Sequence, residues 1–192
     1  MNILLINPPN CGRSLPEERY GIAGIKLIFR GEPLSLETLA GNLGQHAVAI
    51  ADLKADADVL SPDKLPFTPD LIGLTGVTCE ANTMLAHTKA LKSRFAAVIV
   101  VGGQHASCDP FFFATPCVDY VVVGLGKRSF RDLVDMLEAQ KTHAIDGILP
   151  IVNGAAQPFT PRAMSVADLL SQCLAPLHAH GGSGKNEEKA PS

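Results

Sequence analysis

The chain has 192 residues, of which 46% are hydrophobic and 18% charged, with no tryptophan and a formal net charge of -3. This length suits one domain with a substantial core plus a short appendage. The slightly negative net charge and the lack of a basic patch argue against a nucleic-acid-binding protein. Neither a signal peptide nor an apolar run of membrane-spanning length is visible, so we expect a cytoplasmic protein that binds neither nucleic acid nor membrane.

The strands are predicted from short apolar runs that end in glycine or proline. Asn2–Asn7 stops at Pro8 and Pro9, which cannot continue a strand. A β-branched run, 98–101, leads directly into Gly102 and Gly103, as is typical of a strand buried on both faces. The further predicted strands are 47–52, 70–75 and 119–123.

Helices are predicted between these strands from apolar residues that recur at helical spacing. A long connection over 8–33 precedes the first helix, which carries Leu36, Leu39 and Leu43. The second helix is expected over about 80–95, and Ser129 is predicted to cap the third, which continues to 137. Strands that alternate with helices in this way predict an α/β protein with a doubly wound, five-stranded parallel sheet covered on both faces.

The α/β domain is predicted to occupy residues 1–142. Residues 143–162 are expected to add a small hairpin at the sheet edge, because an Asn153-Gly154 turn separates two apolar segments. A further helix is expected over 163–180, and the polar low-complexity stretch 181–192 reads as a flexible tail.

A ligand site is predicted at one edge of this sheet, because open doubly wound sheets bind ligands outside the carboxyl ends of their strands. Glycines at several of these ends would let a ligand approach the main chain closely, which suits a broad flat ligand or a long tail. A mononucleotide or a flavin would fit equally well. The strand-end candidates are Asn7, Pro8, Pro9, Thr75, Gly76, Val77, Gly102, Gly103, Gly124 and Gly126.

Motifs for several other kinds of site are missing. The dinucleotide fingerprint GxGxxG, the phosphate-binding GxxxxGK[ST] and the hydrolase elbow GxSxG do not occur. A phosphorylated receiver domain needs acidic residues where this chain has Asn7 and Thr75. Five scattered cysteines without CxxC or CxxxCxxC spacing favour reduced thiols over disulfides, and they predict neither a zinc site nor an iron–sulfur cluster.

Four segments together resemble one family. They are GIKLIFRGEPLSLETLA, PDLIGLTGVTCEANT, VVGGQHAS and VDYVVVGLGKRSFRDLVDMLE. In combination they are similar to the cobalamin-binding N-terminal domain of cobalamin-dependent radical S-adenosylmethionine enzymes, particularly the branch with the anaerobic magnesium-protoporphyrin ester cyclase. The resemblance covers roughly residues 1–170.

The resemblance implies a flavodoxin-like, Rossmann-like three-layer α/β/α fold that holds cobalamin over the carboxyl edge, with its nucleotide tail lowered into the sheet. Thr75 and Val77 match the S-x-L motif, whose hydroxyl can bond the tail. Gly102 and Gly103 match the glycine pair that lets the tail pass, and a Cβ at either one is expected to collide with it. His105 and Ser107 lie beside them in the family's GGxHxS pattern.

Three departures from the family limit these expectations. The segment 7–12 has no histidine, so we expect cobalamin without a protein histidine on cobalt, in a base-off form. Gly124-Leu125-Gly126-Lys127 replaces a Gly-Glu-Gly-Glu segment. The CxxxCxxC motif and the barrel that carries it are missing, so no catalytic residue is assigned and no activity is expected from the chain alone.

The resulting hypothesis is a stand-alone corrinoid-binding module that carries cobalamin, or presents it to a separate radical S-adenosylmethionine catalytic subunit. One alternative is a regulatory protein that responds to cobalamin or a tetrapyrrole and reports to a partner. Another alternative is a relic domain that no longer binds cobalamin.

Overall fold

The computed structural model describes residues 1–9, 33–61 and 63–163. Within these ranges, one seven-stranded sheet has the order β2-β1-β3-β4-β5-β6-β7. β1 to β5 pair in parallel, whereas β6 pairs antiparallel with β5 and β7 antiparallel with β6. The strands are β1 (Asn2–Asn7), β2 (Ala47–Asp52), β3 (Leu71–Gly76), β4 (Val98–Gly103), β5 (Tyr120–Val122), β6 (Ile148–Val152) and β7 (Ala155–Ala156).

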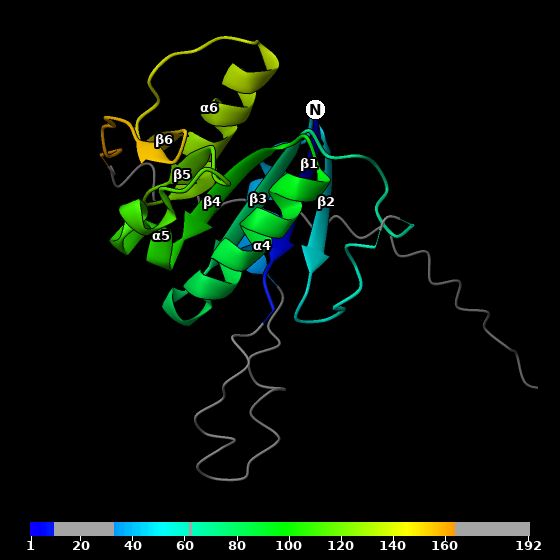
Figure 1. Cartoon of the computed structure of the whole chain (residues 1–192). Helices are drawn as coiled ribbons and strands as arrows, with labels where there is room; N and C mark the ends of the chain where they lie inside the picture. Colours follow the sequence, from blue (N-terminus) through cyan, green and yellow to red (C-terminus); the bar gives the residue numbers. More distant parts are fainter. Residues whose placement is uncertain (10–32, 62, 164–192) are drawn as a thin grey trace, which may run out of the picture.

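Helices cover both faces of this sheet, and α4 crosses one of them in Figure 1. Apolar side chains of α4 join one buried cluster, and those of α3 and α6 join a second cluster on the opposite face. The helices are α3 (Leu34–Gly41), α4 (Ala81–Arg94), α5 (Gln104–Cys108) and α6 (Gly126–Glu138), with 3-10 turns η1 (Thr78–Glu80) and η2 (Pro110–Phe113). The predicted three-layer, doubly wound α/β fold is therefore confirmed.

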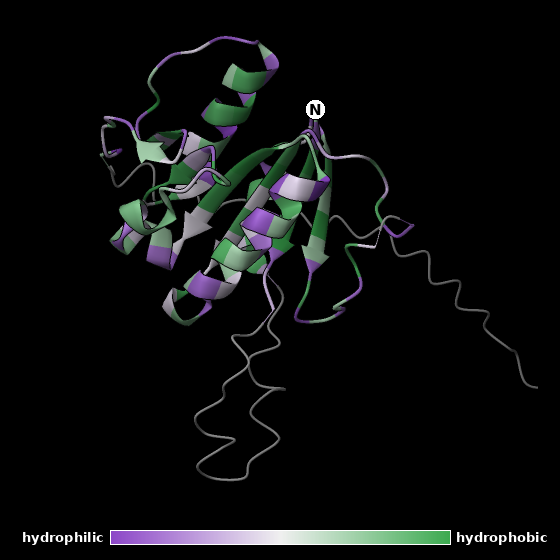
Figure 2. Cartoon of the chain, viewed as in Figure 1, coloured by the Kyte–Doolittle hydropathy of each residue, from purple (hydrophilic) through white to green (hydrophobic). Residues whose placement is uncertain are grey.

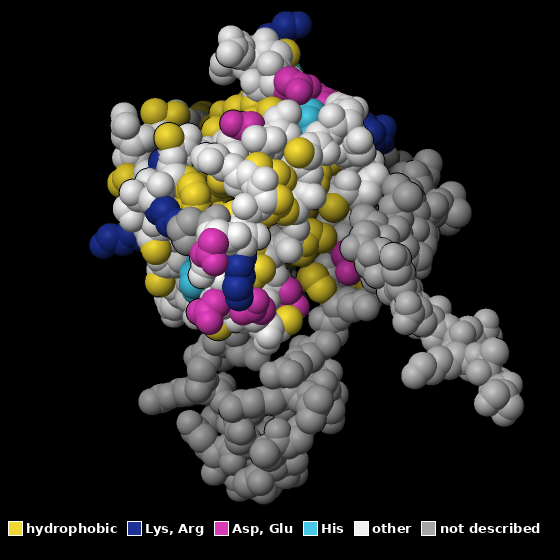
Figure 3. Space-filling view, turned by 90° about the vertical axis from the view of Figure 1, so that its right-hand side faces the viewer, with side chains coloured by type: hydrophobic (Ala, Val, Ile, Leu, Met, Phe, Trp, Pro, Cys, Tyr) yellow, Lys and Arg dark blue, Asp and Glu magenta, His cyan; other side chains and the backbone are white. Residues whose placement is uncertain are grey.

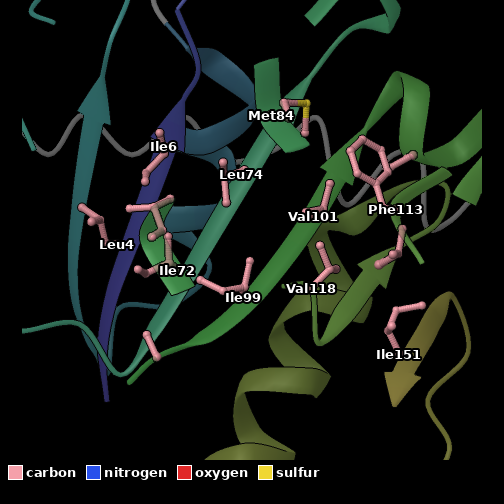
Figure 4. Close-up of a cluster of buried hydrophobic side chains, with 14 of the residues drawn as sticks. Leu4, Ile6, Ile72, Leu74, Met84, Ile99, Val101, Phe113, Val118 and Ile151 are labelled. Atoms are coloured by element: carbon pink, nitrogen blue, oxygen red, sulfur yellow. The ribbon is translucent and has the colours of Figure 1, made fainter. Parts of the chain in front are cut away.

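The central strands supply both clusters because successive residues of a strand point to opposite faces. Ile99 and Val101 of β4 pack toward α4, whereas Val100 packs toward α3 and α6. Figure 2 shows these strands as hydrophobic along most of their length, and Figure 4 shows Ile99, Val101 and Met84 within the cluster on the α4 side. A strand buried on both faces needs such an uninterrupted apolar run.

The predicted cap of the last helix was wrong. α6 begins at Gly126, directly after the extended residue Leu125, so Ser129 lies inside the helix. The Ser129 side chain is buried, and its Oγ donates to the Asp146 carbonyl at 2.8 Å. It therefore ties α6 to the connection before β6 instead of capping a helix end.

The predicted hairpin is present as β6 and β7, and the chain after it returns to α6. Gly147 N donates to the Thr160 carbonyl at 2.7 Å. Arg162 Nη2 lies 2.5 Å from Asp132 Oδ2 on α6, and its Nε donates to the Asp146 carbonyl. Apart from residue 163, the helix expected over 163–180 lies outside the described residues, as do the tail 181–192 and most of the connection 8–33.

The surface of the described part carries mixed charges. On the face shown in Figure 3, hydrophobic, acidic and basic side chains are interspersed, and the described residues there form no extended basic patch. In the same ranges of the chain, every helix is too short or too polar to cross a bilayer.

Candidate functional site

A cavity of about 570 Å3 lies between the sheet and the helices α3 and α6, toward the carboxyl ends of β3, β4 and β5. Small-molecule sites typically enclose about 300–1,000 Å3. The cavity is lined by Leu5, Ser35, Leu36, Thr38, Leu39, Gly73, Leu74, Thr75, Val100, Gly102, Gly103, Gln104, Ser107, Val122, Gly124, Leu125, Gly126, Lys127 and Phe130.

The strand register determines which residues of the sheet line the cavity together. Leu5, Gly73 and Val100 are partners across β1, β3 and β4, and they form the inner row of the cavity. Thr75 and Gly102 are partners nearer the carboxyl end and belong to the outer row. The two glycines differ: a Cβ on Gly73 would lie 3.0 Å from Leu5 Cδ2 and 3.6 Å from a ring carbon of Phe130, so these side chains already fill the space over Gly73, whereas the space over Gly102 stays open.

The two adjacent glycines of β4 have different environments. A Cβ on Gly102 would lie 3.4 Å from Val122 Cβ, an ordinary contact within the cavity wall. A Cβ on Gly103 would lie 2.6 Å from the Gly76 carbonyl oxygen and 2.7 Å from Thr75 Oγ1, and Gly103 has φ +102°. At Gly103 the adjacent strand itself excludes a side chain, with or without a ligand, and the expected collision of a Cβ with a bound tail stays a prediction for both glycines.

Polar side chains of the cavity come from the segments that follow the strand ends. Ser107 Oγ on α5 donates to the Gly103 carbonyl at 2.8 Å and accepts from Gly124 N at 2.9 Å, so it joins the ends of β4 and β5. Thr38 Oγ1 on α3 donates to the Leu34 carbonyl. α6 starts at the cavity with Gly126 and Lys127, without a side-chain cap. Helix N-termini of this kind attract anions.

A separate polar cluster lies beside the ends of β1, β2 and β3 and outside the cavity lining. Asn7 Nδ2 donates to Asp52 Oδ1 at 2.8 Å. Lys54 Nζ lies 2.6 Å from Glu80 Oε1, and both side chains are largely buried. Glu80 Oε2 also accepts from Val77 N at 3.0 Å, so this carboxylate holds the turn that follows β3.

The structure therefore brings together only part of the predicted site. Thr75, Gly102, Gly103, Ser107, Gly124 and Gly126 line the cavity. Asn7, Pro8, Pro9, Gly76 and Val77 do not line it. A Cβ on Gly76 would lie 2.6 Å from Met84 Sδ, which places this glycine on the α4 side of the sheet.

His105 also lies outside the cavity lining. Its ring packs edge-on against Phe112 and Phe113, with centroid distances of 4.9 and 5.8 Å. Its Nε2 is buried without a hydrogen-bond partner among the described residues. In this position the imidazole contributes to the aromatic cluster behind α5.

Most of the apolar lining was missed from the sequence. Leu39 and Phe130 look like ordinary core residues of amphipathic helices, and their spacing carries no sign of a cavity. Gly73 did carry a signal, because a glycine inside an apolar strand often marks a close approach by another group. In the described ranges, no group of three or more His, Cys, Asp or Glu residues could hold a metal ion.

Comparisons with solved structures identify the fold. Two structures of the radical S-adenosylmethionine methyltransferase TsrM from Kitasatospora setae match with TM-scores of 0.63 and 0.64 at 19% sequence identity. One was solved with tryptophan substrate and an S-adenosylmethionine analogue, the other with cobalamin and a [4Fe-4S] cluster. The matches cover 83% and 86% of this chain but 30% of TsrM.

Sequence comparisons identify the family. The chain is 32% identical over 175 residues to an uncharacterised methyltransferase of Pyrococcus horikoshii, covering 85% of this chain and 36% of that protein. The chain thus spans about a third of the length of this curated relative. The family model for the B12 binding domain matches residues 21–134, which is more than half of the chain. The chain therefore belongs to the B12 binding domain family.

Proposed function

We propose that this chain binds cobalamin, with the nucleotide tail in the cavity beside β3 and β4 and the corrin ring over the carboxyl edge of the sheet. The observation that carries the proposal is the cavity beside Gly102 in a chain of the B12 binding domain family. The cobalamin-bound TsrM structure, which has a similar fold over this region, supports it.

The chemistry of the cavity suits the parts of a nucleotide tail. Thr75 and Ser107 offer hydroxyl oxygens in the outer part. The uncapped N-terminus of α6, together with Lys127, suits the phosphate group, because both favour an anion. The apolar part of the lining, which includes Leu39, Val122 and Leu125, suits a flat aromatic base.

We further propose that the tail base does not coordinate cobalt in the bound state. A base held in the cavity, between the sheet and α3, would be separated from a corrin ring that lies over the carboxyl edge. His105 is packed against Phe112 and Phe113, and the segment 8–33 contains no histidine. These placements support the proposal of a base-off cofactor without a protein imidazole on cobalt.

The proposed role is to carry the cofactor, or to present it to a separate radical S-adenosylmethionine catalytic partner in the cytoplasm. Cobalamin, when bound, would supply the reactive cobalt atom, which can accept an alkyl group and pass it on. The residues of this chain would bind the tail and orient the corrin ring. The support comes from the named relatives, because TsrM and the Pyrococcus horikoshii protein are methyltransferases of which this chain matches only 30% and 36%.

Binding can be tested with hydroxocobalamin. The purified chain is mixed with the corrinoid, separated from free ligand by gel filtration, and its visible spectrum is recorded. We expect corrin absorbance to elute with the protein at near-equal stoichiometry, with band positions of a base-off corrinoid. A colourless protein would overturn the proposed function, whereas a base-on spectrum would overturn only the proposed cobalt environment.

A further inference from the structure

Building on the proposed binding of cobalamin, we infer that Glu80 and Lys54 are positioning residues for the ligand. Neither side chain lines the cavity. Together they hold the main chain at the end of β3, and with it the hydroxyl of Thr75, which does line the cavity. The end of β3 is thus fixed before a ligand arrives.

The last residues of β3 are paired with a neighbouring strand on one side only. Toward β4 the register continues through Thr75 with Gly102 and Gly76 with Gly103. Toward β1 it stops at Leu74, the residue before Thr75. The ends of secondary-structure elements open more readily than their middles. The Thr75 hydroxyl therefore belongs to a strand end that pairing with β4 alone would hold less firmly.

Glu80 supplies a second attachment for this strand end. Its Oε2 accepts from Val77 N, the first main-chain donor after β3, at 3.0 Å. A Cβ on Gly76 would lie 2.9 Å from the same oxygen, so the carboxylate also lies against this glycine. Glu80 is 4% exposed, so water hardly competes for these contacts.

Lys54 connects this carboxylate to the neighbouring strands. Its Nζ lies 2.6 Å from Glu80 Oε1, and its main-chain N donates to Asp52 Oδ1 at 3.0 Å. Asp52 Oδ1 in turn accepts from Asn7 Nδ2 at 2.8 Å. The contacts therefore join the ends of β1 and β2 to the turn after β3. Open sheets of this type bind ligands at the change in strand order, which here lies between β1 and β3.

Only a carboxylate satisfies both donors that meet at residue 80. Val77 N and Lys54 Nζ approach different oxygens of Glu80. A carboxamide of the same shape has one oxygen and one NH2 group, so it can accept from one donor and turns its NH2 group toward the other. Glu80→Gln should therefore loosen the end of β3 without changing the size of the side chain.

The test measures the cobalamin affinity of the intact chain by titration monitored by visible absorbance, under conditions in which circular dichroism shows each variant to be folded. We expect Glu80→Gln to bind cobalamin about 2- to 10-fold more weakly than the native chain, as for the loss of one hydrogen bond to the ligand. Should Glu80→Gln fail to fold, the double variant with Lys54→Met takes its place, because it leaves no buried ammonium group without a partner.

An unchanged affinity in the folded variant would overturn the inference and leave the proposed function standing. If the native chain itself does not bind cobalamin, the proposed function fails and the inference fails with it.

Asp119→Asn is the matched control, because Asp119 also joins a lysine to a main-chain N–H. Its Oδ2 lies 2.6 Å from Lys92 Nζ and accepts from Ile99 N at 2.7 Å. Asp119 directly precedes β5, so it lies at the amino edge of the sheet and outside the cavity lining. We expect Asp119→Asn to leave cobalamin affinity unchanged, whatever its effect on the urea midpoint. Equal losses of affinity in the two variants would mean a general loosening of the fold and would overturn the inference.

A double-mutant cycle tests the route through Thr75. Thr75→Val removes the hydroxyl that Glu80 positions. In that background Glu80→Gln should cost less than about twofold in cobalamin affinity, because groups that act together give non-additive effects. The same fold-loss with and without the Thr75 hydroxyl would overturn the assignment of Glu80 as a positioning residue.

Discussion

Thr75 of β3 and Gly102 of β4 are register partners, so a hydroxyl-bearing side chain in the cavity lies beside a position that has no side chain. A ligand that fills the space over Gly102 would contact the Thr75 side chain. In the proposed complex this pair provides both the space and a hydrogen-bonding group for the nucleotide tail. Each half of the pair can be tested separately.

Thr75→Val removes the hydroxyl and keeps the branched shape of the side chain. We expect the binding free energy of cobalamin to weaken by about 0.5–1.5 kcal/mol, the usual net contribution of one hydrogen bond. Titration monitored by visible absorbance measures the change. Thr88→Val is the control, because Thr88 is buried on α4, outside the cavity lining, and its hydroxyl donates to the Leu85 carbonyl. An equal loss in both variants would contradict a role for Thr75 in binding.

Gly102→Val should block the cavity and leave the fold in place. The added Cβ meets only Val122 at ordinary contact distance, and the two γ-methyl groups would occupy the space of the tail. We expect cobalamin to be lost on gel filtration while the circular dichroism spectrum stays that of the native chain. Retained binding at unchanged stoichiometry would show that the tail does not lie beside this residue.

Gly103→Ala should destabilise the fold itself. Its Cβ would collide with the Gly76 main chain, and the residue has a left-handed φ of +102°. We expect the free energy of unfolding to fall by about 2–4 kcal/mol, measured by urea denaturation. Gly124→Ala is the matched control, because Gly124 has φ +82° but nothing within 4 Å of an added Cβ. Equal losses in the two variants would mean that φ, and not the collision, sets the cost.

Glu80→Gln should weaken the turn after β3. It removes the charge that pairs with Lys54 and leaves a largely buried ammonium group uncompensated. We expect a loss of about 3 kcal/mol in the free energy of unfolding. The double variant Lys54→Met with Glu80→Gln should recover part of that loss. Asp56→Asn, which breaks the exposed pair with Lys64, should leave the urea midpoint unchanged. A midpoint in Glu80→Gln equal to that of the native chain would contradict this account.

His105→Phe should leave cobalamin affinity unchanged. The phenyl ring can keep the edge-on contacts with Phe112 and Phe113, and it removes a buried nitrogen that has no partner among the described residues. We expect stability to stay the same or to rise, because an unpaired buried polar atom is costly. The same corrinoid titration and urea denaturation measure both quantities. A clear loss of affinity would instead place this histidine in the binding site.

The sheet could be predicted because its signal is local. Apolar β-branched runs such as 98–101, each ended by glycine or proline, mark strands that are buried on both faces. The position of His105 could not be predicted in the same way, because which side chains face the cavity depends on the conformation of the segment after Gly103. It forms α5, in which Gln104 and Ser107 share the face toward the cavity and His105 points elsewhere.

The helix walls of the cavity could not be predicted either. Leu36 and Leu39 fit an amphipathic helix whether the space beside them is filled or empty. The open space lies over Gly102, which the register between strands aligns with Thr75. Register depends on long-range pairing, and no local pattern in one sequence states which residues will be neighbours across strands.

The opposite orientations of Gly102 and Gly103 have a consequence for the history of this family. Gly103 is required by the contact between β3 and β4, so every descendant that keeps the sheet should keep it. Gly102 leaves room for a ligand, so selection on this glycine should end once the ligand is no longer bound. In lineages that have abandoned the cofactor, the second glycine of the pair should persist while the first drifts to alanine or larger residues. The two glycines look like one motif in the sequence, but the fold constrains Gly103 and ligand binding constrains Gly102.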